Sequence, residues 1–442
     1  MANLSVPDPS TAAPAPTPYW WEAAPRPKLD IPALPRSVDV AVVGSGITGL
    51  NAARVLARSG RSVTVLDAQD AGHGASTRNA GFIGRTFKHR FTDLERRYGL
   101  ERAIAVYREL QAVFECIVET IRSEGIECQL QTLGRLMPAA SKAHYNDLAR
   151  ELEAQRRHFG VEFEMLPKAR LREELATDIY EGGALLEGLG GLHPGLYHDG
   201  LLRSATRAGA QVVPHTGVTQ VTRKSQRTLT VATTRGAIEA RHVIIATNGY
   251  TGDLVPWVRR RLIPFDAFMI ATEPLAPALA DRVIPRRRVC IDTNHNPLFV
   301  RRSPDGSRIL FGGLTGTRPG DLQAKSCHLM HMLRRLLPDL AETEVQFGWT
   351  GRCAATFDMF PHIGEHDGVH YAIGYCFAGV PMGTYLGQKV AYAILGKPEA
   401  KTVFASGTFP SMPLYTGRPW FVPALMRFYQ LLDARTPAGA LA

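Results

Sequence analysis

The sequence predicts an α/β protein (α+β overall) in which a Rossmann-like nucleotide-binding domain is joined to a second domain with a mostly antiparallel sheet. Three observations support this prediction. Residues 38–67 have the pattern of a strand, a glycine-rich turn, a helix and a second strand that ends in an acid. Residues 262–347 contain short strand patterns separated by turns. With 442 residues, the chain is also too long for one small core.

Residues 1–36 are rich in proline and alanine, and we expect them to form an extended N-terminal arm. The arm lacks the basic start and the apolar core of roughly 7 to 15 residues that mark a secretory signal. Trp20 and Trp21 lie within it. Two large aromatic side chains in such a segment suggest an anchor that fixes the arm to the folded body.

The segment that follows the arm carries the clearest functional motif. Gly44 permits a tight turn, Gly46 lets the backbone approach a pyrophosphate, and Gly49 lets the helix pack closely on the strand. The N terminus of this helix adds unpaired N–H groups and the positive end of its dipole. Asp67, 23 residues after Gly44, ends the second strand, where its carboxylate can accept hydrogen bonds from a ribose diol. The motif therefore predicts a dinucleotide site.

Two helices and a run of short strands come next. Residues 101–123 and 141–159 have the apolar spacing of amphipathic helices, and the second is bounded by a Ser141 cap and by Gly160. We expect the further elements of this part as a strand over 161–165, a helix over 197–208 and strands over 211–213, 229–231, 237–239 and 242–246.

The remaining elements complete the second sheet and return to the nucleotide domain. Strands are expected over 263–273, 297–301 and 309–313. A second glycine-rich loop, 374–383, precedes an apolar helix over 386–395, and such a loop at a helix start is a candidate site for an anion or a dipole.

These patterns predict a discontinuous domain organisation. After the arm, the nucleotide-binding domain is expected over 37–100, 188–255 and 348–400. The substrate and helical-cap domain is expected over 101–187 and 256–347, and a C-terminal extension over 401–442.

Composition excludes several classes of protein. The formal charge of +10 is mostly dispersed along the chain, which disfavours nucleic acid and suits an anionic substrate or a membrane surface. The six cysteines have no C-x-x-C spacing, so we expect neither a metal site nor a disulfide framework, and we expect a cytoplasmic protein. No apolar run reaches the roughly 18 to 20 residues that span a bilayer.

Several short motifs resemble, in this order, the D-amino-acid-oxidase-like flavoprotein superfamily. The resemblance is closest to its bacterial branch of γ-glutamylputrescine oxidoreductases and related amine oxidases. It extends from about residue 19 to 421. The motifs that carry it are Tyr19-Trp20, Gly-Ala-Ser-x-Arg-Asn-x-Gly at 74–81, Leu-His-Pro at 192–194, Ala-Thr-Asn at 246–248, Ala-Thr-Glu-Pro-Leu at 271–275, Asp-x-x-Pro-x-Ile-Gly at 358–364 and Pro-Leu-Tyr-x-Gly-x-Pro-Trp at 413–420.

The resemblance implies FAD as the cofactor, bound noncovalently because Arg78 and Asn79 stand where covalent relatives have a histidine. It also implies that Gly44 to Gly49, with Ile47 and Thr48, hold the pyrophosphate and that Asp67 holds the ribose. The other residues implied to contact the nucleotide and the ribityl chain are Ala75, Ser76, Asn79, Val218, Ala246 and Thr247. Those implied to line the flavin ring are Gly351, Gly379, Val380, Pro381, Met382, Gly383 and Thr384.

The resemblance further implies the oxidation of an amine or amino acid. A hydride would pass from the carbon beside the nitrogen to N5 of FAD, and the resulting imine would be hydrolysed. Sarcosine oxidases present a lysine to oxygen on a strand that here reads Arg308-Ile309-Leu310-Phe311 without a lysine. Both O2, reduced to H2O2, and a quinone or another electron carrier therefore stay open as the acceptor.

Five residues are candidates for the substrate side of the site: Tyr250, Met269, Arg301, Arg352 and His89. An arginine would suit a substrate carboxylate, because its guanidinium binds carboxylates through two parallel hydrogen bonds. His89 departs from the small, apolar stretch that is usual at this place in the superfamily.

Other functions stay open at this point. The main alternative is a membrane-associated amine or amino-acid dehydrogenase that reduces a quinone, with residues 420–429 dipping weakly into the membrane surface. A flavin-binding module without turnover and a nicotinamide enzyme are further alternatives.

Overall fold

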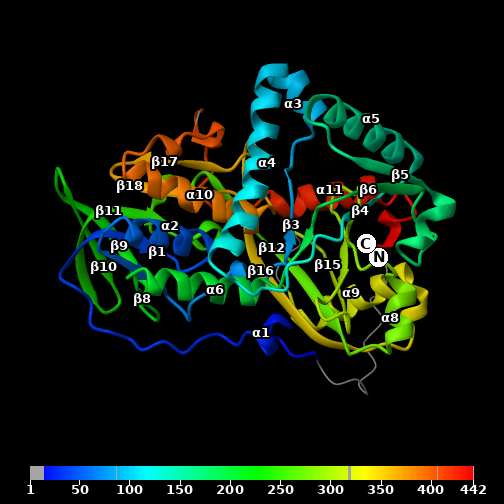
Figure 1. Ribbon diagram of the computed structural model, residues 1–442, viewed down its shortest axis with the longest axis horizontal. Helices are drawn as coiled ribbons and strands as arrows, with labels where there is room; N and C mark the ends of the chain where they lie inside the picture. The colour runs from blue at the N-terminus through cyan, green and yellow to red at the C-terminus, as the bar shows by residue number, and fades with distance from the viewer. Residues whose placement is uncertain (1–13, 86, 317–319, 406, 442) are drawn as a thin grey trace.

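The computed structural model describes residues 14–85, 87–316, 320–405 and 407–441 (Figure 1). Residues 1–13 of the expected arm lie outside this part of the chain. Two eight-stranded sheets form the body of the molecule, one at each side of the view. The predicted class, α/β with a second and mostly antiparallel sheet, is confirmed.

The first sheet has the strand order β17-β18-β11-β1-β2-β8, and β10 and β9 extend it from β11 as an antiparallel hairpin. Strands β8, β2, β1, β11 and β18 are parallel to their neighbours in this order, so their carboxyl ends meet at one edge. Its strands are β1 (Ser37–Val43), β2 (Val63–Leu66), β8 (Gln211–Val213), β9 (Val218–Ser225), β10 (Thr228–Thr233), β11 (Gly236–Ile245), β17 (His362–His366) and β18 (Val369–Ile373).

The central strands of this sheet are covered on both faces, and their sequences are accordingly apolar runs rather than alternating patterns. Val40 and Val42 of β1 pack into the core on one face, and Ala41 and Val43 pack into the core on the other. The helices near the first of these faces are α2 (Ile47–Arg58), α4 (Leu100–Ser123), α6 (Pro194–Arg207) and α10 (Gly379–Ile394).

The second sheet has the order β16-β12-β15-β14-β13-β4-β6-β5, with only β13 and β4 parallel to each other. Helix α9 packs against β12, β15 and β16. The strands are β4 (Arg135–Pro138), β5 (Phe163–Pro167), β6 (Gly182–Leu186), β12 (Leu262–Thr272), β13 (Val289–Ile291), β14 (Phe299–Arg302), β15 (Ile309–Gly313) and β16 (Val345–Thr356). The remaining longer helices are α3 (Phe91–Tyr98), α5 (Lys142–Phe159), α8 (Pro277–Val283), α9 (Leu322–Leu336) and α11 (Val422–Asp433).

Short elements connect the two sheets. Strands β3 (Phe82–Ile83) and β7 (Gly190–Gly191) pair with each other. The other short elements are α1 (Trp20–Ala23), α7 (Pro256–Arg259) and the 3₁₀ turns η1 (Ala75–Thr77), η2 (Lys168–Glu173), η3 (Asn248–Tyr250), η4 (Pro338–Leu340), η5 (Pro398–Ala400), η6 (Val403–Ala405) and η7 (Gly439–Leu441).

The predicted helix signals are confirmed where a cap defines them. The hydroxyl of Ser141 accepts a hydrogen bond from the backbone N–H of His144 at 3.2 Å, and α5 ends at Gly160 with φ +65°. Helix α6 begins earlier than predicted, because the His193 ring accepts a hydrogen bond from the Leu196 N–H and Pro194 suits the first helical position.

Two other predictions differ from the structure. Helix α10 begins at Gly379 and not at 386, so the glycine-rich loop itself forms its first turns. Strand β16 crosses residue 348, where a domain boundary was expected. The domain boundaries given above stay a prediction. None of the helices in the described residues is both long and apolar enough to cross a bilayer.

Glycines let α10 lie directly on α2. A Cβ on Gly383 would be 2.9 Å from the Thr48 hydroxyl oxygen, and a Cβ on Gly387 would be 2.5 Å from the Thr48 carbonyl oxygen. The two glycines are four residues apart and therefore lie on one face of the helix. Any larger side chain at Gly387 must push α10 away from α2.

We expect Gly387→Ala to lower the free energy of unfolding by about 1–3 kcal/mol, because the added methyl group meets backbone and not a flexible side chain. Gly379→Ala is the matched control, since its nearest neighbour would be an ordinary contact at 3.9 Å. Chemical denaturation of both variants measures the effect. Equal stability of Gly387→Ala and the unmodified chain would contradict this account of the packing.

Candidate active site

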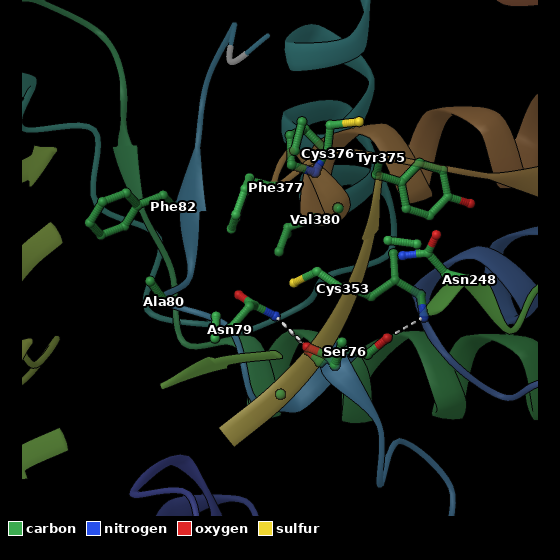
Figure 2. A pocket seen from close by; sticks show the side chains of 18 of the residues that line it. Ser76, Asn79, Ala80, Phe82, Asn248, Cys353, Tyr375, Cys376, Phe377 and Val380 are labelled. Carbon is green, nitrogen blue, oxygen red and sulfur yellow. Dashed lines mark hydrogen bonds between the residues drawn. The ribbon is translucent and has the colours of Figure 1, made fainter. Parts of the chain in front are cut away.

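A cavity of about 870 Å³ lies where the two sheets meet (Figure 2). Loops at the carboxyl edge of the first sheet form one wall, including Gly44, Asp67 and Thr247. Side chains of the second sheet, among them Met269 and Phe299, form another. The cavity therefore joins the predicted dinucleotide site to the predicted substrate domain.

The glycine-rich turn after β1 has the geometry that its sequence predicts. Gly44 has φ +101°, and its N–H donates to the Leu66 carbonyl at 2.8 Å. A Cβ on Gly49 would lie only 2.0 Å from the Gly44 carbonyl oxygen, so the residue permits the close packing of α2 on this turn. Gly49 itself is not part of the cavity wall.

Gly46 makes room for a neighbouring loop. A Cβ at this position would be 2.8 Å from the Ser76 hydroxyl oxygen. That oxygen accepts a hydrogen bond from the Ile47 N–H at 3.0 Å. The loop that contains Ser76 is therefore attached to the first turn of α2, where N–H groups have no partner within the helix.

Asp67 faces the cavity from the end of β2. Its Oδ2 accepts hydrogen bonds from the N–H and the hydroxyl of Ser45 at 2.8 and 2.6 Å, and its Oδ1 accepts one from the Gln69 N–H at 3.0 Å. A carboxylate has about four acceptor positions, so one stays available for a ligand hydroxyl. Val218, at the start of β9, also lines the cavity.

The loop of residues 74–81, called the serine loop below, is held by its own side chains. The amide nitrogen of Asn79 donates to the carbonyls of Ala75 and Ser76 at 3.1 and 3.0 Å, and its amide oxygen accepts from the Gly81 N–H at 2.7 Å. The Asn79 side chain thus fixes the turn that presents Ala75 and Ser76 to the cavity.

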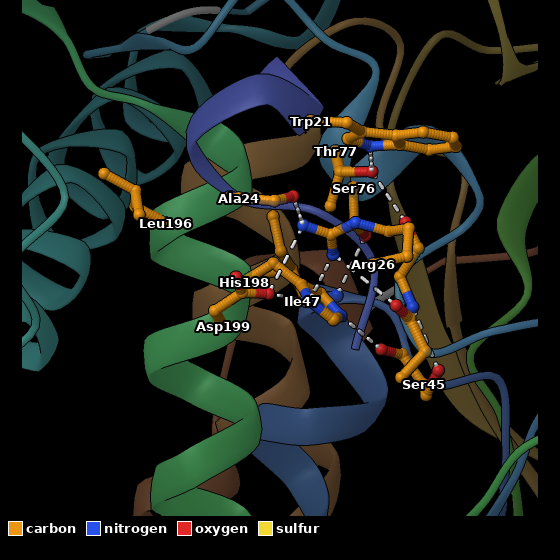
Figure 3. Close-up of polar contacts among 12 residues, drawn as sticks. Trp21, Ala24, Arg26, Ser45, Ile47, Ser76, Thr77, Leu196, His198 and Asp199 are labelled. Carbon is orange, nitrogen blue, oxygen red and sulfur yellow. Dashed lines mark hydrogen bonds and ion pairs between the residues drawn. The ribbon is translucent and has the colours of Figure 1, made fainter. Parts of the chain in front are cut away.

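The N-terminal arm also holds the serine loop, which confirms the expected aromatic anchor. The indole N–H of Trp20 donates to the Asn79 carbonyl and that of Trp21 to the Thr77 hydroxyl, both at 2.9 Å. Figure 3 shows the second of these contacts. Trp20 is fully buried. The arm and the serine loop are therefore attached to each other at two points.

Arg26 continues this attachment toward the glycine-rich turn (Figure 3). Its guanidinium lies 3.2 Å from Nδ1 of His198 and 3.3 Å from the carboxylate of Asp199. On its other side, Nε2 of His198 lies 2.8 Å from the Ser45 carbonyl oxygen. Burial lowers the pKa of Arg26, and the Asp199 carboxylate opposes this effect.

The first turn of α10 forms the opposite wall. Gly379, Val380 and Pro381 line the cavity, and Gly351 lines it from β16. Cys376 and Phe377, just before α10, have φ values of +46° and +77°, so the chain enters the helix through a left-handed turn. This turn places the Phe377 and Val380 side chains at the cavity (Figure 2).

Besides Gly49, four residues expected at the cofactor lie away from the cavity wall. Met382 is buried in the core, and Gly383 faces α2. The hydroxyl of Thr384 is hydrogen-bonded to that of Tyr197 at 2.7 Å. The N–H of Ala246 donates to the Val43 carbonyl at 2.9 Å. These residues lie behind the cavity wall, in the core or against neighbouring elements.

Four of the five candidates for the substrate side line the cavity: Tyr250, Met269, Arg352 and His89. The Arg352 N–H donates to the Tyr250 hydroxyl at 3.2 Å, and the Arg352 guanidinium pairs with Asp266 at 3.0 Å. The hydrogen bond that its guanidinium donates to Asp266 raises the pKa of Arg352. The ring of His89 lies against Phe360, with Nε2 2.7 Å from the Asp358 carbonyl oxygen.

The fifth candidate, Arg301, was expected at the substrate, and the structure places it elsewhere. Its guanidinium donates to the Ala80 and Leu192 carbonyls at 3.1 Å each, and only 2% of the residue is exposed. Burial lowers its pKa to about 10. The Arg301 side chain thus joins the segments that contain Ala80 and Leu192. It does not line the cavity.

Sequence reasoning missed four basic residues of the wall: Arg85, Lys88, Arg90 and Arg135. The first three lie on both sides of His89 in the run 85–90, which also contains Phe87. That density of cations next to a predicted ligand loop was the available signal. Arg135 lies on β4, far from this run in the sequence, and no pattern around it indicated that it lines the cavity.

The two cysteines of the wall are not ionised. Burial raises the pKa of Cys353 to about 12 and that of Cys376 to about 11. Both thiols are therefore neutral near pH 7, and neither has the thiolate character of a redox-active cysteine.

Comparison with known families identifies the fold and its cofactor. The family model described as FAD dependent oxidoreductase (DAO) matches residues 39–393. The chain is 31% identical over 390 residues to the γ-glutamylputrescine oxidoreductase of Escherichia coli, with 87% of this chain and 89% of that protein covered. It is 30% identical over 390 residues to the probable oxidoreductase OrdL of Haemophilus influenzae, with 86% and 88% covered.

Solved structures share the fold at lower identity. The glycine oxidase of Geobacillus kaustophilus superimposes with a TM-score of 0.71 at 22% identity, over 86% of this chain and 99% of that one. The L-proline dehydrogenase of P. horikoshii gives a TM-score of 0.69 at 19% identity, over 89% and 99%. The arrangement of the two sheets is therefore that of known enzymes.

We expect Trp21→Phe to weaken the affinity for FAD about twofold to tenfold, because it removes one neutral hydrogen bond to the serine loop and keeps the aromatic packing. Titration of the cofactor-free protein with FAD, followed by flavin fluorescence, measures the change. Trp257→Phe is the control, since Trp257 packs against His366 away from the cavity wall. Unchanged affinity in Trp21→Phe would show that the arm does not position the loop.

Proposed function

The chain belongs to the family of FAD dependent oxidoreductases, and from this premise we propose that it oxidises a small amine or amino acid at the carbon beside the nitrogen. The proposal is supported by the relative that is named for γ-glutamylputrescine and by the one named for glycine. The observation that carries it is the position of the cavity, which joins a dinucleotide edge to a wall with apolar side chains.

The residues of the cavity fit FAD. The cavity extends from Gly44 and Asp67 to the first turn of α10, and the first turn of α2 also lies on it. Two helix N termini thus face the same space, and each favours a negative charge. We propose that the pyrophosphate binds at α2 and that the flavin ring lies near Gly351 and Gly379.

The chain itself would position and shield the substrate. Met269, Phe82 and Phe299 give the cavity an apolar region from which water is excluded when the substrate binds. The Tyr250 hydroxyl, whose pKa burial raises, is a neutral polar group that can orient the substrate. FAD, when bound, would supply the acceptor for the hydride from the carbon beside the nitrogen, and water would hydrolyse the imine product.

The mode of cofactor binding and the electron acceptor are part of this proposal. We propose that FAD is bound noncovalently, because Arg78 and Asn79 of the serine loop stand where covalent relatives have a histidine. O2 and another electron carrier are both compatible with the cavity. A cytoplasmic location stays a prediction.

We expect the purified protein to show the two visible absorption bands of oxidised flavin, and we expect an amine or amino acid to bleach them under anaerobic conditions. Acid precipitation should leave the flavin in the supernatant, because it is not covalently bound. Admission of air with a peroxide assay then separates O2 from other acceptors. A flavin-loaded protein that no primary, secondary or N-methyl amine bleaches would contradict the proposal.

One observation favours a second candidate function, a dehydrogenase at a membrane surface. The segment 414–431 exposes large apolar side chains, with Leu414 99% and Trp420 73% exposed. It also exposes basic residues, which suit an anionic membrane. This patch consists of Leu414, Arg418, Trp420, Arg427, Phe428 and Leu431.

We expect the protein to float with vesicles that contain anionic lipid, and we expect the double variant Trp420→Ser/Phe428→Ser to lose this binding. Leu133→Ser is the control, because Leu133 is an exposed leucine outside the patch. A protein that stays at the bottom of the gradient with every vesicle composition would exclude the membrane-associated alternative.

A further inference from the structure

Helix α11 lies outside the segment that matches the family model, because that match ends at residue 393 and the helix begins at Val422 (Figure 1). Each end of α11 nevertheless contacts a wall of the cavity. Near its start, Val422 packs in one cluster with Cys376, which lines the cavity before the first turn of α10. At its end, Asp433 contacts residues 292–297, called the β13–β14 loop below. The helix thus connects the two walls.

The β13–β14 loop has the cavity on one side and solvent on the other. Asp292, Thr293, Asn294 and Pro297 line the cavity. The side chain of His295, in the middle of the loop, is 43% exposed. One layer of chain therefore separates this end of the cavity from bulk water.

The first part of the loop is held by contacts to the rest of the second sheet. Asp292 Oδ1 accepts a hydrogen bond from the Leu298 N–H at 3.1 Å, and its Oδ2 accepts one from the Tyr180 hydroxyl at 3.0 Å. The Thr293 hydroxyl oxygen accepts a hydrogen bond from the Ala140 N–H at 3.0 Å. These contacts fix the loop as far as Thr293.

The tip of the loop is held by Asp433. Its Oδ1 accepts a hydrogen bond from the His295 N–H at 2.9 Å, and its Oδ2 accepts one from the Asn296 N–H at 3.0 Å. Nδ1 of the His295 ring lies 2.8 Å from Oδ1, and this nitrogen is the donor because a carboxylate only accepts. The same ring stacks on Tyr429, one turn earlier in α11, with the ring centres 5.5 Å apart. Hydrogen bonds to a carboxylate are stronger than those between neutral groups, so this attachment is a firm one.

The position of Asp433 in its own helix does not explain why it is buried. Asp433 is the last residue of α11, where the helix dipole disfavours a negative charge, and it is only 3% exposed. In the described part of the chain, its one ion-pair partner is His295. A buried carboxylate is costly without compensating partners, so the hydrogen bonds from the loop are what stabilise it there.

The Asp433 carboxylate is close enough to the cavity to influence two side chains of its wall. Desolvation lowers the pKa of Lys88, and the Asp433 carboxylate opposes this effect. Burial raises the pKa of Asp292 to about 7, and the Asp433 carboxylate adds to the rise. A change at the end of α11 therefore reaches the cavity.

We propose that Asp433 is a positioning residue of the active site, which holds the tip of the β13–β14 loop in place and so keeps bulk water out of the substrate end of the cavity. This inference rests on the proposed function, because the second sheet is assigned to the substrate. Helix α11 then belongs to the active site although it lies outside the matched segment. Exclusion of water strengthens the polar contacts that orient a bound amine.

Quenching of the flavin fluorescence of the holoenzyme by acrylamide, a small uncharged probe, tests the proposal without any substrate. We expect Asp433→Ala to raise the Stern–Volmer constant at least twofold, because the released loop admits the quencher. Asp433→Asn should give a smaller rise, since its amide oxygen can still accept from His295 but the acceptor of the Asn296 N–H is lost.

Glu109→Ala is the matched control for a general loosening of the C-terminal segment. Glu109 also holds this segment, through hydrogen bonds from the Val403 N–H at 2.7 Å and the Tyr385 hydroxyl at 2.9 Å, but it does not line the cavity. Both alanine variants should melt at a lower temperature than the unmodified chain, and only Asp433→Ala should change the quenching. Equal quenching in Asp433→Ala and the unmodified chain, or an equal rise in Glu109→Ala, would overturn the proposal.

Kinetics separate positioning from a structural role. For an amine that bleaches the flavin under anaerobic conditions, Asp433→Ala should raise the concentration that gives the half-maximal rate about fivefold or more. The limiting rate should stay within twofold, and the affinity for FAD should not change, because the loop lies on the second sheet and away from the dinucleotide edge. Loss of FAD from Asp433→Asn would overturn the proposal, since Asp433 would then support the cofactor.

The two measurements also distinguish this inference from the function on which it rests. If quenching rises in Asp433→Ala and no amine bleaches the flavin, the positioning role stands and the proposed oxidation fails. If amines bleach the flavin of the unmodified chain and of Asp433→Ala at the same concentrations, the oxidation stands and the role of Asp433 fails.

Discussion

The hydrogen bond from the Ile47 N–H to the Ser76 hydroxyl is the contact on which the geometry of the site depends. It joins the first turn of α2 to the serine loop, and it exists only because Gly46 has no side chain to occupy the same space. The dinucleotide edge of the first sheet and the loop that leads to β3 are therefore fixed relative to each other. The position of the segment after β3, which contains Arg85 and Lys88, therefore depends on this contact.

The arm extends this constraint across the chain. Two tryptophans hold the serine loop from outside, and Arg26 connects them through His198 to the carbonyl of Ser45. Charge is then distributed unevenly within the cavity. Asp67 lies at the nucleotide edge, whereas Arg85 and Lys88 line the cavity from the segment that follows β3. A ligand with a polar end for each region would be oriented by this difference alone.

Much of the fold could be predicted from local signals. The glycines after β1, the capped helix α5 and the strands of the second sheet all have patterns that are decided by nearby residues. The dinucleotide part of the site followed from the same patterns, because a turn between strand and helix needs glycine at defined positions. The start of α10 was missed since its first turns are rich in glycine and proline, which usually indicate a loop.

Contacts between distant segments could not be predicted in this way. The sequence indicates that Arg301 lies on a strand, but not that the Ala80 and Leu192 carbonyls approach it from two other segments. The contact between Trp21 and Thr77 spans 56 positions and has no local pattern. The same holds for Arg85 and Arg135, whose proximity depends on how β4 meets the loop after β3.

The neutral state of Cys353 and Cys376 has a further consequence for durability. An enzyme that reduces O2 generates peroxide inside its own cavity, and peroxide converts thiolates, not thiols, to sulfenic acid. With O2 as the electron acceptor, peroxide would form in the cavity, and the protonated thiols of Cys353 and Cys376 would react with it far more slowly than thiolates.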